Sequence, residues 1–377
     1  MTTITNPFMH FKLIKDYRQA AKVEHKLSDI ILLTICGVLS GFDTWEGISD
    51  FGESRIDFLT SLGDFKNGIP SSDTIARVMG MVNPTAMQKA FISWMKDCHQ
   101  LTEGEVVAID GKTVRGSYNK SEERSAIHMV NAFATAQGLC LGQSKVNDKT
   151  NEITEIPRLL ELLNLSGCLV TIDAMGCQRK IAQKIVDKNA DYLLAVKGNQ
   201  GQLEQAINNF YRPSMLQNFV EGESYSSQEK GHGREETRCA LVTNELSFLD
   251  DLAHEWPHLK SVGIMVNFRQ FEEPATEEED MSIRFYISSK RLSAKELHDA
   301  TRSHWGIESM HWQLDVTFRE DECRIRVDDR AEVFSRVRQV CLNLLKQETS
   351  FKGGIQRKRM KCAMDVSYLS KVLRVLE

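Results

Sequence analysis

Short apolar runs alternate with amphipathic segments between Glu105 and Tyr211, and this alternation constrains the fold more than any other feature of the sequence. Strands are expected in VVAID, CLVTID and DYLLAVKG, and two more in HMVNAFATAQGLCLGQSKV, because these runs are short and apolar. Helices are expected in NEITEIPRLLELL, QRKIAQKIVDKNA and GQLEQAINNFYR. The order strand, strand, strand, helix, strand, helix, strand predicts an α/β fold, with a mixed sheet and flanking helices.

The segments on either side of this region differ from it and divide the chain into four predicted parts. Residues 1–95 are expected to form a helical N-terminal domain, a candidate for DNA binding, and residues 96–212 the first part of the core. Residues 213–292 contain strand-like runs separated by polar loops and are predicted to form a β-rich insertion. Residues 293–377 complete the core with a helix and end in a basic tail. Ser293 and Glu296 predict a capping box at the start of that helix.

Two aspartates follow predicted strands directly. Asp110 ends VVAID and Asp173 ends CLVTID. In open α/β sheets, ligands gather at the carboxyl ends of the strands. An aspartate after a buried strand is also a common turn former, so each residue alone is weak support for a site.

The stretch HWGIESMHWQLD supplies a third acid on a predicted helix. At roughly 100° per residue, one narrow stripe of this helix carries four polar side chains between two apolar flanks. A solvated polar face normally lies opposite the apolar one, so we expect the stripe to face inward. Trp305 and Trp312 are expected to pack in the core, with stacking on a displaced base as the alternative. The stripe consists of His304, Glu308, His311 and Asp315.

Asp110, Asp173 and Glu308 together suit a hard divalent cation. Mg²⁺ prefers oxygen ligands and completes its shell with water and substrate phosphates, and we expect Mn²⁺ to substitute for it. Two such ions about 4 Å apart can activate the attacking oxygen and stabilise the leaving oxygen of an in-line displacement at phosphorus. The metal would also relieve the repulsion between the carboxylates.

Four motifs in order resemble the DDE transposases of bacterial insertion sequences. They are AIDGKTVRGS, VTIDAMGCQ, YLLAVKGNQ and HWGIESMHWQLDVTFRED, and the resemblance covers nearly the whole chain, being closest to the H-repeat-associated transposases. It implies a ribonuclease-H-like core, a β-rich insertion before the catalytic glutamate, and an N-terminal helical region associated with DNA binding. Carried over by motif, Asp110, Asp173 and Glu308 are the catalytic, metal-binding triad.

The resemblance also implies a reaction and its partners. The expected enzyme is a Mg²⁺-dependent DNA transposase, which cuts and joins phosphodiesters at insertion-element ends without a covalent protein–DNA link. Its partner is double-stranded DNA, both element ends and target. Because two ends must be brought together, we expect a dimer in the DNA complex.

The sequence departs from the Tyr, Arg, Glu, Lys pattern of the wider superfamily around the catalytic glutamate. Thr301, His304 and Asp315 stand at the Tyr, Arg and Lys positions. Other residues must therefore grip the phosphates. The candidates for DNA contact are Lys112, Arg115, Lys197, His232, Arg234, Arg302, His304, His311 and Arg319.

Charge and cysteine content restrict where the protein acts. The net charge is −5, so contact with nucleic acid must come from local patches, such as the arginines of residues 319–338 and the tail at 352–361. The nine cysteines form no C-x-x-C pair, which argues against a zinc ribbon and indicates a reducing compartment. No apolar run approaches the ~20 residues of a membrane span. We expect a cytoplasmic protein with no membrane partner.

Two other functions remain open at this point. His304, Glu308 and His311 lie on one helical face and could form the His₂Glu set of a zinc hydrolase. Their order differs from H-E-x-x-H, and Asp110 and Asp173 would have no role. The second alternative is a DNA-binding protein of the same fold that has lost catalysis.

Overall fold

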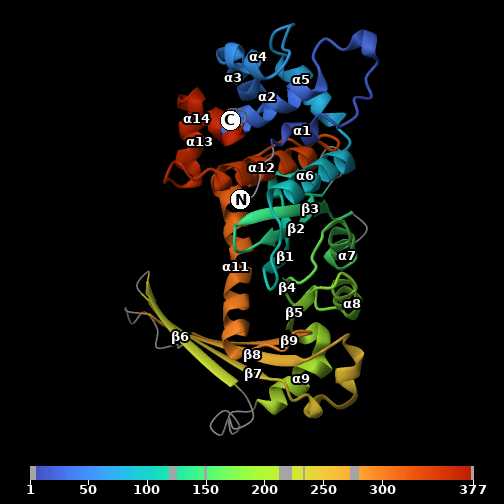
Figure 1. Ribbon diagram of the computed structural model, residues 1–377, viewed down its shortest axis with the longest axis vertical. Coiled ribbons are helices and arrows are strands. Elements are labelled where there is room, and N and C mark those ends of the chain that lie inside the picture. The colour runs from blue at the N-terminus through green and yellow to red at the C-terminus, as the bar shows by residue number, and fades with distance from the viewer. Residues whose placement is uncertain are drawn as a thin grey trace.

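The computed structural model describes residues 6–118, 125–147, 151–211, 223–231, 234–271 and 280–374. Its long axis holds a helical layer at one end, a sheet in the middle and a group of long strands at the other end (Figure 1). The predicted four-part division stays a prediction. His232, a candidate for DNA contact, lies outside the described residues, and of Arg234 only the backbone, at the start of a strand, is described.

A nine-stranded mixed sheet forms the centre of the molecule, in the order β3-β2-β1-β4-β5-β9-β8-β7-β6. β1, β4 and β5 are parallel, and the other neighbours are antiparallel. The mixed α/β fold is therefore confirmed. The strands are β1 (Val106–Thr113), β2 (His128–Ala134), β3 (Leu139–Lys145), β4 (Leu169–Ile172), β5 (Asp191–Val196), β6 (Glu223–Gly231), β7 (Arg234–Thr243), β8 (Ser261–Phe271) and β9 (Asp280–Ser288).

The helices between the core strands follow the predicted order. The chain runs β1, β2, β3, α7, β4, α8, β5, α9, as the periodicity of the sequence predicted. These helices bury their apolar faces, for example Ile156 and Leu159 of α7 and Ile181 of α8, in a core shared with the sheet. Their bounds are α7 (Glu152–Leu162), α8 (Arg179–Asp187) and α9 (Gly201–Phe210).

Strands β6 to β9 extend the core sheet. β9 pairs with β5 along Leu193–Val196, so the segment between the second aspartate and the glutamate joins the same sheet. The sequence predicted β7, β8 and β9 but missed β6. β6 is polar and mostly exposed, so it has none of the apolar alternation that identifies a half-buried strand.

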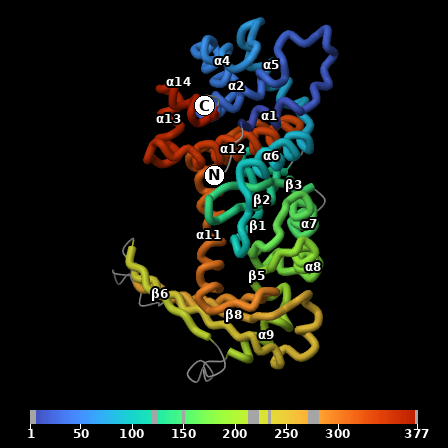
Figure 2. Tube along the Cα trace, in the orientation of Figure 1, coloured from blue at the N-terminus to red at the C-terminus, as the bar shows by residue number. Residues whose placement is uncertain are grey.

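The two ends of the chain form one helical layer (Figure 2). α12 (Arg330–Gln347) is buried on nearly every side, because it packs against the N-terminal helices and also against β3. Asn343 of α12 bonds both backbone groups of Cys140 in β3, at 3.0 and 2.8 Å. The other helices of the layer are α1 (Phe8–Phe11), α2 (Leu27–Leu39), α3 (Trp45–Ser54), α4 (Ile56–Leu62), α5 (Ser72–Gly80), α6 (Pro84–Cys98), α13 (Ile355–Met364) and α14 (Val366–Leu373).

One long helix, α11 (Ala294–Val316), connects the inserted strands to the helical layer (Figure 1). The predicted capping box is present: the Ser293 side chain accepts from the Glu296 backbone N–H, and the Glu296 carboxylate accepts from Ser293 N. Ile307, Met310 and Leu314 bury its apolar stripe. α11 crosses β1 and β4 on one face of the sheet, which places the HWGIESMHWQLD stretch over the strands that carry the two aspartates.

Candidate active site

The two aspartates stand on neighbouring parallel strands. Ile109 of β1 is in register with Ile172 of β4, so Asp110 and Asp173 occupy the next positions along their strands. Asp110 is the fifth residue of VVAID and lies inside β1, whereas β4 ends just before Asp173. The Asp173 carboxylate accepts from Gly176 N at 3.2 Å and so shapes the turn that follows the strand. Parallel pairing therefore places the two aspartates at adjacent positions on neighbouring strands.

α11 brings the third acid to the same place. Ligand atoms of Asp110, Glu308 and His311 all lie within 4.8 Å of one another. Asp110 is half-buried, Glu308 is exposed and His311 is buried. Two carboxylates and an imidazole at this spacing could share one divalent ion. Asp173 lies outside this group, at the adjacent strand end.

The electrostatics of the site agree with a concentration of negative charge. Burial, followed by the charge of Glu308, raises the pKa of Asp110 to about 7, and the charges of Asp173 and Glu152 add to this effect. Burial is also the main cause that raises the pKa of Asp173, opposed by its bond from Gly176 N–H. These carboxylates repel one another, and a bound cation would reverse that penalty.

Glu152, the first residue of α7, could not be singled out from the sequence. Its carboxylate lies 2.5 Å from His128 Nε2, and its charge raises the pKa values of both Asp110 and Asp173. A Cβ at Gly111 would collide with the Glu152 carboxylate and the His128 ring, so glycine beside Asp110 permits this approach. No spacing pattern links residues 111, 128 and 152, because only the fold joins them.

The two histidines of the inward-facing stripe are held by polar neighbours. His304 Nδ1 lies 2.8 Å from Thr171 Oγ1 on β4, and His311 Nε2 lies 3.2 Å from Asn131 Nδ2 on β2. Burial lowers the pKa of each ring to about 4, so both are neutral at pH 7. The zinc alternative is not favoured, because His304 is outside the group formed by Asp110, Glu308 and His311.

Lys112 does not face solvent, although the sequence suggested a phosphate contact. Lys112 is 8% exposed. Its ammonium lies 2.6 Å from Asp315, 3.0 Å from Glu320 and 3.7 Å from Asp321. Asp315, at the Lys position of the superfamily pattern, is therefore a partner of Lys112. A buried lysine that already contacts three carboxylates is not placed to bind DNA.

The remaining basic candidates lie at or near the surface. The Arg115 side chain is 83% exposed. Arg302 contacts Glu229 at 2.9 Å and Arg319 contacts Glu322 at 2.5 Å, both in exposed ion pairs. Lys197 is exposed at the end of β5, on the same sheet edge as Asp173. These four side chains can reach a ligand without unfolding of the core.

A cavity of about 340 Å³ opens beside Asp173 and Glu308. Its lining includes the cations Lys197 and Arg284 and the rings of Tyr286 and Trp305, together with the carboxylates of Asp173, Glu204 and Glu308. The Arg284 guanidinium lies 5.1 Å from the centre of the Trp305 ring. The cations can attract a phosphate and the rings can stack on a flat apolar group, whereas the three carboxylates call for a cation of their own.

The expectation that the tryptophans pack in the core was wrong. Trp305 is 47% exposed and Trp312 is 60% exposed. They lie three residues before and four residues after Glu308, so they are its neighbours on the helix surface. Ile307, Met310 and Leu314 fill the buried stripe of α11, so both indole rings lie outside it.

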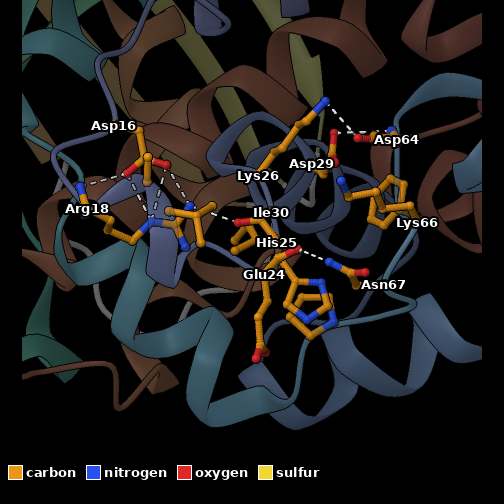
Figure 3. A pocket seen from close by; sticks show the side chains of 14 residues that line it. Asp16, Arg18, Glu24, His25, Lys26, Asp29, Ile30, Asp64, Lys66 and Asn67 are labelled. Carbon is orange, nitrogen blue, oxygen red and sulfur yellow. Dashed lines mark hydrogen bonds and ion pairs between the residues drawn. The ribbon is translucent and has the colours of Figure 1, made fainter.

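A second pocket, in the helical layer, is less suited to DNA (Figure 3). Its most prominent charges pair with one another: Arg18 with Asp16 at 2.7 Å, and Lys26 with Asp64 at 2.7 Å. Because these cations already have carboxylate partners, the pocket offers little net attraction for phosphate.

Comparison with known proteins agrees with this geometry. The family model described as "Transposase DDE domain" matches residues 101–344, and one described as "DDE_Tnp_1-associated" matches residues 8–95. The chain belongs to the DDE transposase family. The first matched region contains Asp110, Asp173 and Glu308, and the second spans α1 to α5 and most of α6.

Close relatives of this DDE transposase come from Escherichia coli. "Putative transposase YncI" of strain O157:H7 is 50% identical over 97% of this chain and 93% of its own length. "H repeat-associated putative transposase YhhI" of strain K12 is 48% identical over 97% of this chain and 96% of its own length. The resemblance to the H-repeat-associated group is thereby confirmed.

Among solved structures, a piggyBac transposase synaptic complex with hairpin DNA aligns with 99% of this chain and 82% of its own, at 11% identity and a TM-score of 0.45. That likeness is too low for a detailed comparison of the folds. None of the helices described in this DDE transposase has the length and apolar character that a membrane span requires.

Proposed function

We propose that this DDE transposase cuts and joins phosphodiesters at the ends of an insertion element, using divalent metal ions held by Asp110, Asp173 and Glu308. One observation carries the proposal: Asp110 and Glu308, far apart in the chain, come together beside the strand that ends at Asp173. The site also lies next to a cavity whose lining holds Lys197, Arg284 and aromatic rings as well as carboxylates. The double-stranded DNA of element ends and target is the proposed substrate.

The arrangement of β1 to β5 supports a ribonuclease-H-like core. Three consecutive antiparallel strands are followed, through α7 and α8, by two strands parallel to the first. β1 is therefore central, and its neighbour β4 ends at the same edge. This order gives two acids adjacent positions and leaves one face for α11.

The donor set fits Mg²⁺, with Mn²⁺ as a substitute. Carboxylate oxygens suit these hard cations, and the mutual repulsion of Asp110 and Glu308 gives the site a need for positive charge. When bound, the cations supply Lewis acidity at phosphorus and neutralise charge on the reacting oxygens. Asp110 and Glu308 would hold them, and Asp173 would complete the set from the end of β4.

The surface residues around the site orient the DNA. Lys197 lines the cavity with Asp173 and is placed to contact backbone phosphates, together with Arg284. Arg115 is exposed beyond the end of β1 and is a further candidate. Arg302, Arg319, His232 and Arg234 remain candidates farther along the surface. Lys112 and His311 are withdrawn from the DNA-contact set, because each is buried and has polar partners within the protein. His304 lines the cavity beside Glu308 and stays a candidate.

The proposal is tested with the purified protein and supercoiled plasmids that carry candidate element ends. Nicking at the end sequence in Mg²⁺ or Mn²⁺, with none in Zn²⁺ or in chelator, is the expected result. A dimer should appear when two ends are present, as seen by size-exclusion chromatography with light scattering. Retardation of DNA without nicking in any metal would instead identify a DNA-binding protein that has lost catalysis.

A further inference from the structure

Asp110 stands at one end of a row of buried polar side chains that reaches α12. His311 Nδ1 lies 3.5 Å from Asp110 Oδ2. His311 Nε2 lies 3.2 Å from Asn131 Nδ2, and Asn131 Oδ1 lies 3.2 Å from Gln339 Nε2. Asn131 and Gln339 are fully buried, and His311 is 7% exposed. The four residues come from β1, α11, β2 and α12, and we call them the Asp110 network.

The register of the sheet explains why Asn131 belongs to this network. Asn131 is the cross-strand partner of Asp110, so the two side chains project from the same face of the sheet, toward α11. His311 lies over both of them. A buried asparagine on a central strand is costly unless it is hydrogen-bonded, and here its amide has partners on three sides.

The contacts of Asn131 fix which ring nitrogen of His311 carries the proton. Nδ2 of Asn131 approaches the carbonyl oxygen of Met129 at 3.4 Å, and that oxygen can only accept. Oδ1 accepts from Gln339. The atom that faces His311 Nε2 is therefore an N–H donor, so Nε2 must be the unprotonated nitrogen. In the neutral ring the proton is then on Nδ1, which points at the Asp110 carboxylate.

We propose that Asn131 and Gln339 set the tautomer of His311, and that His311 positions the Asp110 carboxylate through its Nδ1–H. The inference rests on the proposed function, in which Asp110 binds metal. A nitrogen that carries a proton cannot coordinate an ion. His311 is thus excluded from the ligand set despite lying close to Asp110 and Glu308, and it acts as a positioning residue. Such partners of a ligand commonly fix its orientation.

The tautomer can be measured without DNA and without catalysis. Full-length protein labelled with ¹⁵N in the histidine rings gives ring-nitrogen shifts that distinguish Nδ1–H, Nε2–H and the imidazolium. The signals of His311 are assigned from their loss in His311→Gln. We expect Nδ1–H in metal-free protein at pH 7, retained when Mg²⁺ is added. The Nε2–H form, an imidazolium, or a Mg²⁺-induced change at Nδ1 typical of coordination would each overturn the proposal.

A substitution at the far end of the network, with His311 and Asn131 between it and Asp110, gives the sharper test. Gln339→Glu keeps the shape of the side chain, and its ionised carboxylate can only accept, so above the pKa of that carboxyl Asn131 must turn its Nδ2 toward residue 339 and its Oδ1 toward His311. The tautomer should switch to Nε2–H, and Mn²⁺ affinity measured by calorimetry should fall by about 10- to 100-fold. An unchanged tautomer in Gln339→Glu would contradict the proposal.

Asn343→Asp is the matched control. Asn343 lies on the same helix, one turn further on, and is equally buried, but it bonds Cys140. Its substitution should leave the His311 tautomer unchanged, and a switch there would show that the effect is not specific to the network. If Gln339→Glu does not fold, Asn131→Asp presents an acceptor directly to Nε2 and should produce the same loss of Nδ1–H. The expected tautomer without any binding of Mg²⁺ or Mn²⁺ would refute the proposed function and leave the tautomer assignment standing.

Discussion

The two aspartates of the site stand one strand apart and have very different surroundings. Asp110 is enclosed by His311, by the carboxylates of Glu308 and Glu152, and by buried polar residues that lead to the helical layer. Asp173 adjoins an open cavity that is lined by Lys197, Arg284 and Trp305. The enclosed half can fix the geometry of a metal site, whereas the open half can admit DNA. Each of the following predictions tests this division.

The largest expected effect is on cleavage. Asp173→Asn and Glu308→Gln should each lower strand nicking by at least roughly 1000-fold, since Lewis-acid stabilisation of several kcal/mol is lost. DNA affinity should change little, because basic side chains dominate it. Plasmid nicking and gel retardation measure the two properties on the same preparations. Cleavage retained in one of these variants would remove its substituted residue from the metal-binding set.

The second prediction concerns the stability of the enclosed half. Lys112→Met should lower the free energy of unfolding by about 1–3 kcal/mol, because Glu320 would lose its nearest cation and keep only Arg338, at 3.6 Å. Arg115→Ala removes a nearby but exposed cation and should change stability by less than about 0.5 kcal/mol. Urea denaturation compares the two variants. Equal effects would show that the burial of Lys112 is not what stabilises this region.

The third prediction concerns how the free energy of unfolding depends on pH. Asp110 should make it fall as pH rises, which is opposite to the effect of most carboxylates. Folded Asp110 keeps its proton up to about pH 7, whereas in the unfolded chain it releases it near pH 4. The folded state therefore binds the extra proton in this window, and stability falls as pH rises through it. Asp110→Asn removes the effect and should gain stability relative to the unsubstituted metal-free protein between about pH 4 and 7, by up to a few kcal/mol.

Mg²⁺ provides the control for this pH dependence. The cation favours the ionised carboxylate, so the advantage of Asp110→Asn should shrink or reverse when Mg²⁺ is present. Urea denaturation at pH 4 and pH 7, with and without the ion, measures the change. An advantage of Asp110→Asn that is the same at both pH values would mean that Asp110 is ionised throughout.

The smallest expected effect is on DNA affinity in the open half. Lys197→Ala should weaken binding modestly and reduce the slope of log affinity against log salt by about one. Lys188→Ala is the control, because Lys188 follows α8 near the start of β5, at the opposite edge of the sheet. Fluorescence anisotropy across a salt series measures both. The same slope for Lys197→Ala and the unsubstituted protein would place the DNA elsewhere.

Much of the fold could be predicted because it depends on local periodicity. The order of β1 to β5 with α7 and α8, and the capping box at Ser293, are visible as apolar patterns and cap residues. β6 could not be predicted, because a polar edge strand has no apolar face to reveal it. The three acids were found from strand ends and motifs, and their catalytic roles stay a prediction.

The helical stripe of HWGIESMHWQLD shows where periodicity stops being informative. It indicated correctly that His304 and His311 share an inward-facing side. It did not indicate that the tryptophans would be exposed, because periodicity tells which residues share a face and not how much of that face is covered. The width of the covered stripe depends on the sheet beneath α11.

The sequence by itself determined most of the secondary structure and the family, and it singled out the three acids as candidates, since these follow from short-range patterns and motifs. Only the tertiary structure decided that Lys112 is buried, that Glu152 lies beside Gly111, and that Asn131 and Gln339 reach His311. These facts depend on contacts between strands and helices that are distant in the chain. The side chains that meet at such contacts are selected by packing and register, and no local pattern in the sequence records them.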